Sequence, residues 1–343
     1  MSVVKRGAAV KLRESLIVGD SPEMAEVVDL VEQAAGNDAA VLIEGEPGTG
    51  RELVARTIHY AGARHAGDFV AFKATTIPKR LLEGELFSAR SGTLRRASGG
   101  TLLVKDVDAL PPGPQRGLAR VLKRSDHLPA DVRVMGASDG DLSESVAAAF
   151  FDRELYERLV TRIKIPPLRR RLEDLPKLTR KFLTAAGEEL GRARPRITDA
   201  ALDQLGKYPW PGNVAELKDV TRRLVLAMKG QGRRGPIDGP IVRGVLPKVA
   251  ERIPMEDMSF EEVVRSKLSG FLRRVDGYPL ENLYDEVISL VERPLLALVI
   301  EHAKGNQLRA AEILGLNRNT LRKKLATHAL AGVDRASRRA RAR

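Results

Sequence analysis

The chain has 343 residues, 43% of them hydrophobic, and this length is typical of two or three domains. It has no cysteine, which excludes disulfides and cysteine-bound metals, and its 5 histidines are scattered, so no metal site is predicted. No apolar run is long enough to span a bilayer, and the basic start of the chain lacks the apolar segment of a signal peptide. We therefore expect a cytoplasmic protein without a membrane partner.

The formal net charge of +13 is concentrated at the two ends of the chain. Residues 1–13 carry four basic residues and no acid, and residues 304–343 carry eleven basic residues and two acids, a difference of +9. The chain between them is therefore neutral. A basic end on a neutral body is typical of a segment that binds nucleic acid. A solvated basic tail is the alternative, and we favour it for residues 335–343 alone.

After a basic segment at residues 1–15, apolar spacing predicts a helix over residues 20–35, with Ser21 as its cap and Pro22 at its first position. Helical segments also include residues 52–60 and 115–122. Short apolar runs indicate four buried strands, at residues 41–43, 69–72, 101–104 and 132–136. Strands that alternate with helices predict an α/β domain over residues 16–168, with a parallel sheet covered by helices on both faces.

Only helical patterns follow Pro166 and Pro167. An α-helical lid is predicted over residues 169–229, with helices at 173–190, 199–205 and 214–228 and a turn at 208–213. Residues 229–240 are rich in Gly, Arg and Pro, and we interpret them as a hinge at the start of a linker over residues 230–280. A C-terminal all-α domain is predicted over residues 281–330, with a long helix at 281–303 and two short helices within 304–330, followed by a basic tail at 331–343.

The stretch VLIEGEPGTGRE, residues 41–52, has the glycine spacing of the phosphate-binding loop G-x-x-x-x-G-K-[ST]. Glycines permit the positive φ angles of such a turn, which directs backbone N–H groups and a helix N-terminus at one point. Arg51 stands in place of the motif's lysine, and Glu52 in place of its Ser or Thr. A glycine turn without a ligand is the alternative. The predicted nucleotide-binding residues are Gly45, Glu46, Pro47, Gly48, Thr49, Gly50, Arg51 and Glu52.

The two short C-terminal helices have the pattern of a helix-turn-helix. Asn306 and Asn317 are suited to cap them, and Gly315 to form the turn. Their apolar set is Leu308, Ala311, Ile313, Leu314, Leu316, Leu321 and Leu325. Polar side chains on the outer face suit base edges and phosphates of a major groove. A helical hairpin with a charged face is the alternative. The predicted DNA-binding residues are Arg309, Asn317, Arg318, Asn319, Thr320, Arg322, Lys323 and Lys324.

An apolar stripe runs along the preceding long helix: Leu283, Val287, Leu290, Val291, Leu295, Leu298 and Val299. We interpret it as the contact between two chains of a homodimer, which would read a palindrome with half-sites about one helical turn apart. The alternative, which periodicity alone leaves open, is a stripe packed within its own chain.

Residues from about 16 to 330 resemble the bacterial enhancer-binding proteins, the sigma-54-dependent AAA+ activators of the NtrC type. The matching stretches include IVGDSPEM, GEPGTGRELVARTIH, LLEGELF, IPPLRRRLEDLP, YPWPGNVAELKDV and GNQLRAAEILGLNRNTLRKKL. The resemblance implies an α/β AAA+ core, a helical lid and a Fis-like helix-turn-helix domain. The receiver domain that usually stands at the N-terminus of the family has no counterpart in the resemblance, and we expect a protein without it.

The working positions of the family are altered here. The family's Asp-Glu pair, which holds Mg²⁺ and polarises water, aligns with Lys105 and Asp106. Further family groups depart as well: the sensor asparagine aligns with Asp139, one arginine with Asp152 beside Arg153, a second is kept as Arg158, and the sensor arginine aligns with Ala215. A cation at the metal position opposes Mg²⁺ binding. The resemblance therefore implies that ATP or ADP can bind, that Mg²⁺ binding is doubtful, and that no working catalytic set is present.

The family's GAFTGA loop, which contacts sigma-54, has no counterpart between Phe87 and Gly99. We therefore predict a sequence-specific DNA-binding transcriptional regulator with a degenerate AAA+ domain that cannot activate sigma-54. Its expected partners are double-stranded DNA, a second copy or a higher oligomer, and RNA polymerase. Two other hypotheses stay open: an active ATPase that remodels a different partner, and a heteromer partner of an intact NtrC-type activator.

Overall fold

The computed structural model describes residues 17–123, 131–147, 150–191, 195–230, 235–247, 259–265, 268 and 283–328. The predicted segments at 1–15 and 331–343, and much of the predicted linker, lie outside these residues. The chain divides into two compact units, residues 1–247 and 248–343, which are described separately.

The first unit is built on a five-stranded parallel sheet in the order β2-β3-β4-β1-β5. Its strands are β1 (Val41–Glu44), β2 (Phe69–Lys73), β3 (Thr101–Lys105), β4 (Arg133–Ser138) and β5 (Thr161–Lys164). The four predicted strands are confirmed, with slightly different ends. The fifth, at the edge of the sheet, was not predicted, because its sequence TRIK contains only one apolar residue and forms no apolar run.

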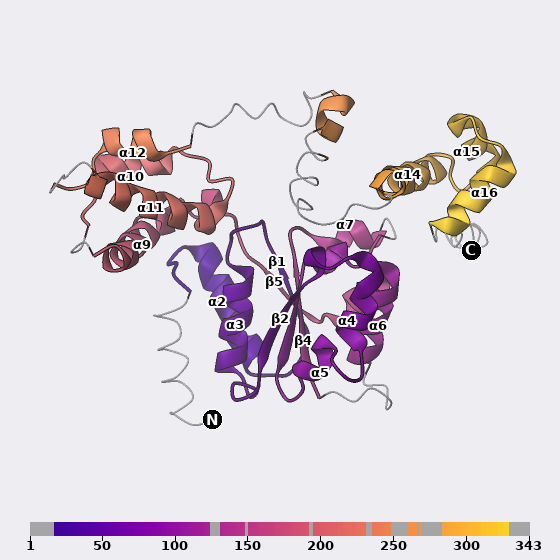
Figure 1. Cartoon of the computed structure of the whole chain (residues 1–343), viewed down its shortest axis with the longest axis horizontal. Helices are drawn as coiled ribbons and strands as arrows, with labels where there is room; N and C mark the ends of the chain where they lie inside the picture. Colours follow the sequence, from indigo (N-terminus) through magenta and orange to yellow (C-terminus); the bar gives the residue numbers. More distant parts are fainter. Residues whose placement is uncertain are drawn as a thin grey trace. The chain divides into compact units, whose positions relative to one another are not determined.

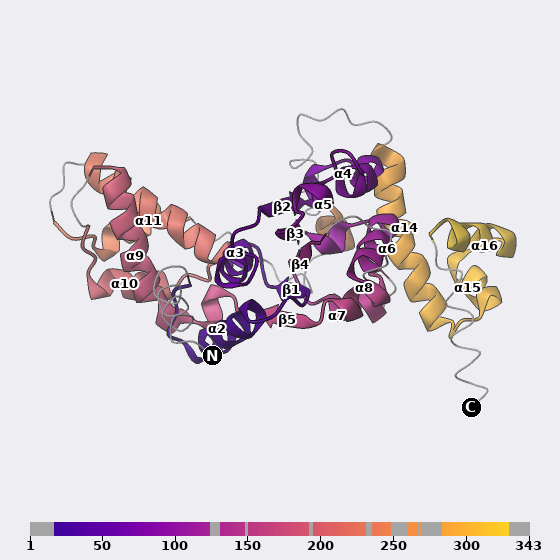
Figure 2. The ribbon, with the colours of Figure 1, turned by 90° about the horizontal axis from the view of Figure 1, so that it is seen from below.

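Helices cover both faces of this sheet, as predicted (Figures 1 and 2). α2 (Pro22–Ala35) and α3 (Arg51–Ala61) pack on the face that carries Val41, Ile43 and Ile163. The opposite face carries Leu42, Leu102 and Val134, which pack in a second core with side chains from most of the other helices. Those helices are α4 (Leu82–Phe87), α5 (Thr93–Arg96), α6 (Pro112–Leu122), α7 (Leu142–Ala147) and α8 (Arg153–Arg158). The alternation follows from the two-residue period of a strand.

Short 3₁₀ turns complete the first unit, at Ala74–Thr76, Lys79–Leu81, Val107–Ala109, Leu168–Arg170 and Leu172–Asp174. The last of these explains one wrong prediction at the first helix. Ser21 does not cap α2 with its side chain, because its hydroxyl donates to a carboxylate oxygen of Asp174 at 2.8 Å. The other Asp174 oxygen accepts the backbone N–H groups of Asp20 and Ser21, so Asp174 ties the start of α2 to the beginning of the lid.

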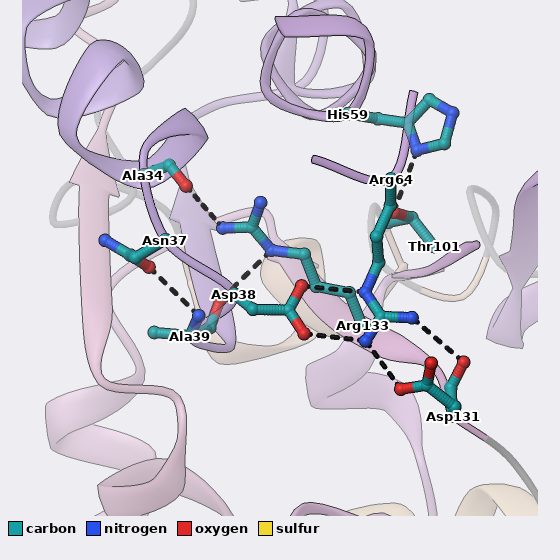
Figure 3. A network of polar contacts seen from close by, with 9 residues as sticks. All are labelled: Ala34, Asn37, Asp38, Ala39, His59, Arg64, Thr101, Asp131 and Arg133. Atoms are coloured by element: carbon teal, nitrogen blue, oxygen red, sulfur yellow. Dashed lines mark hydrogen bonds and ion pairs between the residues drawn. The ribbon is translucent and has the colours of Figure 1, made fainter. Parts of the chain in front are cut away.

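A polar network closes the edge of the sheet at which the strands begin (Figure 3). Arg133, at the start of β4, donates to the carbonyl oxygens of Ala34 at 2.7 Å and Ala39 at 3.2 Å. Arg64 binds both oxygens of Asp38 and also Asp131, and these carboxylates raise its pKa. Nearby, the buried His59 ring contacts the Thr101 hydroxyl through Nδ1 at 2.9 Å. This network joins the ends of α2 and α3 to the sheet.

The lid contains α9 (Leu175–Glu189), α10 (Asp199–Gly206), α11 (Asn213–Gly230) and α12 (Gly239–Val245). Its core surrounds the fully buried Trp210, whose indole N–H donates to the Leu205 carbonyl oxygen at 2.9 Å. The expected hinge at 229–240 is wrong for its described part. Ile237, Ile241 and Val242 are buried in the lid core, and Asp238 caps α12, whose first two residues are Gly239 and Pro240. Gly and Pro serve here as turn and helix start, not as flexible linker.

The second unit contains α14 (Leu283–His302), α15 (Gln307–Leu314) and α16 (Arg318–Thr327). Both predicted caps are confirmed: the Asn306 side chain accepts from Leu308 N and Arg309 N, and that of Asn317 from Asn319 N. Gly315 has φ of 63°, the left-handed conformation that the predicted turn needs.

The core of the second unit differs in part from the prediction. Leu321, Leu325 and Ala311 are buried, but Leu308 and Ile313 are 56% and 49% exposed. Their places are taken by Leu296 and Ile300 of α14, which pack against α15 and α16. Among the described residues, no helix is long and apolar enough to cross a membrane.

Candidate functional site

The glycine loop between β1 and α3 has the geometry that its spacing predicts. Gly48 and Gly50 have φ of 83° and 107°, and Gly50 immediately precedes the first residue of α3. A Cβ on Gly48 would lie 2.2 Å from the Gly212 carbonyl oxygen, so only glycine fits there. The Thr49 hydroxyl donates to the Glu46 carbonyl oxygen at 2.8 Å and closes the turn. The N-terminus of α3 is thus presented at the edge of the sheet where the strands end, a position suited to an anion.

The strand register brings the other predicted positions to the same edge. Glu44 of β1 lies opposite Ser138 of β4, and Lys105 of β3 lies opposite Ala137. Lys105, Asp106 and Asp139 therefore follow neighbouring strand ends next to the loop. This grouping follows from parallel pairing alone, since the carboxyl ends of parallel strands lie along one edge.

Arg51, the first residue after the glycine loop, forms an ion pair with Asp139, the first residue after β4. Arg51 Nη2 lies 2.5 Å from Asp139 Oδ1. Arg51 Nη1 is buried and has no hydrogen-bond partner among the described residues. The guanidinium is therefore held partly by Asp139 and keeps one donor that a ligand oxygen can satisfy.

A second ion pair joins the start of α3 to the end of β3. Lys105 Nζ donates to Glu52 Oε2 at 2.7 Å, and Arg56 holds Glu52 Oε1 at 2.8 Å. The hydrogen bond from Lys105 is the main reason that the pKa of Glu52 lies below its usual value. Asp106 points elsewhere: it is in the left-handed region, with φ of 54°, and its carboxylate accepts the Thr75 hydroxyl at 2.5 Å.

The remaining family positions are engaged locally. Asp152 caps α8 by accepting from Leu155 N at 2.8 Å, and Arg158 binds Glu154 on the same helix at 2.8 Å. Arg153 is exposed at the start of α8. The Ala215 N–H donates to the Gly48 carbonyl oxygen at 3.1 Å, so position 215 lies beside the loop but carries no cation.

A strap of polar contacts, not predicted from the sequence, joins the loop to the lid. Arg169 binds both carboxylate oxygens of Glu46, at 2.5 and 2.6 Å, and is the main cause of the lowered pKa of that carboxyl. The Asn213 amide donates to Glu46 Oε2 at 3.2 Å and to the Pro47 carbonyl oxygen at 3.0 Å. The Glu46 side chain, one of the predicted nucleotide-binding groups, is thus engaged by the lid.

A cavity of about 250 Å³ lies beside the loop and beneath the lid. Most of its lining is apolar: Ile17, Val18, Met24, Thr49, Gly50, Leu53, Val54, Ile165, Arg171, Leu178, Lys181, Phe182 and Val214. Arg171 is only 3% exposed, donates to the Thr49 carbonyl oxygen at 3.3 Å, and has an Nε without a hydrogen-bond partner among the described residues. An apolar cavity with a few polar groups, next to an anion site, suits a flat ring that carries a phosphate chain.

The predicted DNA-reading side chains divide into two groups. Arg309, Arg318, Asn319, Thr320, Arg322 and Lys323 are exposed and have no role in capping, whereas Asn317 is exposed but caps a helix and Lys324 is half-buried. The others have partners within the unit: the Asn317 oxygen caps α16, and Lys324 Nζ lies 2.5 Å from Glu292 Oε1 on α14. The exposed group presents a strongly cationic surface on α15 and α16.

The apolar stripe on α14 is largely exposed where it is described. Of the predicted stripe, Val291, Leu295 and Leu298 are exposed, whereas Val287 and Val299 are half-buried. Tyr284 and Ile288, which the sequence prediction did not include, are also exposed and extend this row at alternating spacings of four and three residues. The side chains of Leu283 and Leu290 lie outside the described residues. Spacing of this kind is typical of the seam between two paired helices.

Three family models match the chain in succession. They are the sigma-54 interaction domain over residues 17–165, the AAA+ ATPase lid domain over 169–233, and the bacterial regulatory protein, Fis family, over 287–328. The DNA-binding transcriptional regulator NtrC of Azospirillum brasilense is 38% identical over 334 residues, which cover 90% of this chain and 68% of the relative. The chain belongs to the NtrC family of bacterial enhancer-binding proteins.

Other NtrC relatives match over similar lengths. NtrC of Rhizobium meliloti is 34% identical and NtrC of Escherichia coli is 33% identical, each over 90% of this chain and 69% of the relative. Among solved structures, NtrX from Brucella abortus in complex with ATP has a TM-score of 0.64 and 27% identity, covering 95% of this chain and 72% of that one. The same protein in complex with ADP has a TM-score of 0.62 and covers 91% and 70%. This NtrC-family chain therefore has a AAA+ core, a lid and a Fis-type helix-turn-helix domain.

Proposed function

We propose that this NtrC-family protein is a sequence-specific DNA-binding regulator whose AAA+ domain binds ATP or ADP without turning it over. The observation that carries the proposal is the presence of two ion pairs beside the phosphate loop, Arg51 with Asp139 and Lys105 with Glu52. The loop keeps the backbone shape of a nucleotide site, but the two cations are paired with carboxylates of the protein itself. In this proposal the protein acts by binding DNA in the bacterial cytoplasm.

Nucleotide binding is supported by three features of the site. The loop presents the N-terminus of α3, Arg51 Nη1 lacks a hydrogen-bond partner among the described residues, and the neighbouring cavity is lined mostly by apolar side chains. A bound nucleotide would supply the phosphate oxygens that these donors lack. The similar NtrX structures contain ATP or ADP.

The residues present do not fit Mg²⁺. A metal ion at the end of β3 would meet the ammonium group of Lys105, which already holds the Glu52 carboxylate at 2.7 Å. Asp106, the nearest acid in sequence, accepts a hydrogen bond from Thr75. Two like charges in one site repel, so we infer that nucleotide binds without the metal. In that case Lys105 itself serves as the counter-charge for a phosphate.

Hydrolysis is the step that these changes remove. Phosphoryl transfer depends on cations and water-positioning groups placed around the transferring phosphate. Here Ala215 carries no charge beside the loop, Asp152 caps its own helix, and Arg158 is paired with Glu154. The test is steady-state ATP turnover by the full chain, compared with Arg51→Ala. Negligible turnover in both is expected, and turnover that the substitution abolishes would refute this part of the proposal.

Sigma-54 activation is also lost, in our proposal, because the segment between Phe87 and Gly99 forms a compact turn and helix instead of a projecting loop. Gly92 N donates to the Ser88 carbonyl oxygen at 2.9 Å, and Leu94 and Ala97 are buried. In vitro transcription with sigma-54 polymerase is the test. No open complexes should depend on this protein and ATP; their appearance would show that another surface contacts the sigma factor.

DNA binding is supported by the exposed cationic face of α16 and by the Fis-type domain. The exposed stripe of α14 supports a homodimer, and two reading helices in a two-fold dimer would recognise a palindrome. RNA polymerase is the further partner that we propose. The test is salt-dependent binding of the full chain to a short mixed-sequence duplex, and then selection of a preferred site from a random pool. Binding that is absent at low salt would refute the DNA-binding role.

A further inference from the structure

Lys324 differs from the other basic residues of α16 in being paired within the protein. Arg318, Arg322 and Lys323 of α16 are exposed, but Lys324 Nζ lies 2.5 Å from Glu292 Oε1 on α14. The Lys324 and Glu292 side chains are 35% and 24% exposed. The other Glu292 oxygen contacts His328 Nε2 at 3.0 Å, and the His328 side chain is 7% exposed. Both oxygens of the Glu292 carboxylate are therefore engaged, one by α16 and one by the residue that follows it.

The position of Glu292 explains why it can hold these groups. Lys324 lies on α16 and His328 directly follows its last residue, four positions further on, so both lie on the side of the helix that carries the buried Leu321 and Leu325. On α14, Glu292 is one turn before the buried Leu296, which packs in the same core. Glu292 thus borders the contact between the two helices. The pKa of its carboxyl lies below the usual value, chiefly because of the hydrogen bond from Lys324.

We propose that Glu292 is a specificity-determining residue for DNA binding, because it withholds the Lys324 ammonium group from the phosphate backbone. The proposal rests on the DNA-binding function proposed above. A lysine that contacts phosphate strengthens binding to every sequence equally and adds about 0.9 to the slope of log K against log salt. Engaging Lys324 within the protein lowers binding to non-target DNA and leaves discrimination to the exposed side chains at the start of α16.

The two adjacent lysines offer a matched experiment on the full chain. We would measure the salt dependence of binding to a mixed-sequence duplex for Lys323→Ala and Lys324→Ala. Lys323→Ala should reduce the slope by about 0.9 for each lost contact, and Lys324→Ala should leave it unchanged. An equal reduction by both substitutions would show that Lys324 contacts DNA and would overturn the proposal. Absence of salt-dependent binding by the unmodified chain would instead refute the DNA-binding function itself.

Glu292→Gln gives the complementary measurement. It frees Lys324, so the slope should become steeper by about 0.9 for each new contact, and binding to mixed-sequence DNA should strengthen more than binding to a duplex selected from a random pool. The double variant Glu292→Gln/Lys324→Ala keeps the loss of negative charge but removes the amine, and its slope should return to that of the unmodified chain. A steeper slope that persists in the double variant would assign the effect to charge alone and contradict the proposal. Thermal unfolding of each variant separates these outcomes from loss of the fold, and Lys324→Gln replaces Lys324→Ala if the latter is unstable.

Discussion

At the scale of single residues, the positions beside the phosphate loop that depart from the family pattern carry opposite charges and pair with each other. Lys105 has a carboxylate partner in Glu52, and Arg51 has one in Asp139, so the charge of each cation is balanced by a neighbouring acid. Each pair is partly exposed, so each contributes modestly to folding stability. Their larger effect is on what the loop can bind, because an incoming phosphate must compete with these carboxylates.

Asp139→Asn should strengthen ADP binding. The substitution removes the acid that lies 2.5 Å from Arg51 and leaves the guanidinium free for a phosphate, with a gain of about 1 kcal/mol. Calorimetric titration of ADP measures the change. Asp141→Asn is the matched control, since Asp141 lies in the same turn but pairs with Lys164. Unchanged or weaker ADP binding in Asp139→Asn would mean that Asp139 does not compete with the ligand.

His59 should make the fold less stable in acid. Burial lowers its pKa from the ordinary 6.5, so the unfolded chain binds the proton more readily than the folded chain. The contribution of neutral His59 is therefore fully present above about pH 6.5 and is lost as the pH falls below that value. Denaturant unfolding of His59→Gln and the unmodified chain should give free energies of unfolding that converge as the pH falls below about 6.5. The exposed His65→Gln is the control, and a constant difference between His59→Gln and the parent chain would contradict the assignment.

At the scale of elements, the sequence predicted those with a strong pattern and missed those defined by tertiary contacts. The four apolar strands, the capped helices α15 and α16 and the parallel α/β architecture are confirmed, because their periodicity and caps are local. The edge strand β5 and the helix α12 lack a local apolar pattern that distinguishes them from loops. The site shows the same division. Parallel strands place Lys105 and Asp139 beside the loop, whereas the partners Arg169 and Asn213 come from the lid, and no spacing in the sequence predicts those contacts.

The strap between the loop and the lid should hold the start of α11 against the AAA+ core. Glu46→Ala removes its bidentate contact with Arg169 and its contact with Asn213, and should favour opening of the lid by about 1 kcal/mol, given the exposure of the pair. Hydrogen exchange should become faster at the backbone N–H of Ala215, which is bonded to Gly48. Glu189→Ala, which breaks the exposed pair with Arg222 within the lid, is the control. Equal exchange in both variants would mean that the strap does not restrain the lid.

At the scale of the whole molecule, the chain combines a nucleotide-binding fold with a DNA-reading unit that carries an unburied apolar stripe. Exposed apolar side chains at seam spacing favour pairing with another helix. In the proposed homodimer this pairing brings two copies of α16 to one DNA site. In the function proposed above, the AAA+ core acts as a scaffold that binds nucleotide without a hydrolysis cycle.

Leu295→Asp should disrupt the dimer and weaken DNA binding. A charge in the middle of the stripe would be buried without a partner at the seam, which costs several kcal/mol. Sedimentation should show a lower mass for this variant than for the unmodified chain, and its DNA affinity should fall with it. Leu226→Asp, at an exposed leucine of the lid, is the control. A dimer that survives Leu295→Asp would place the contact between chains elsewhere.

In the proposed function, Lys105 replaces the metal ion in a site that holds nucleotide without turning it over. Calorimetric titration of the full chain with ADP and with ATP, each in excess Mg²⁺ and in EDTA, tests it most directly. We predict measurable binding with the same affinity in both conditions and no heat of hydrolysis with ATP. Affinity that requires Mg²⁺, together with sustained heat from ATP turnover that Lys105→Asp does not increase, would contradict the claim and identify the protein as a working ATPase.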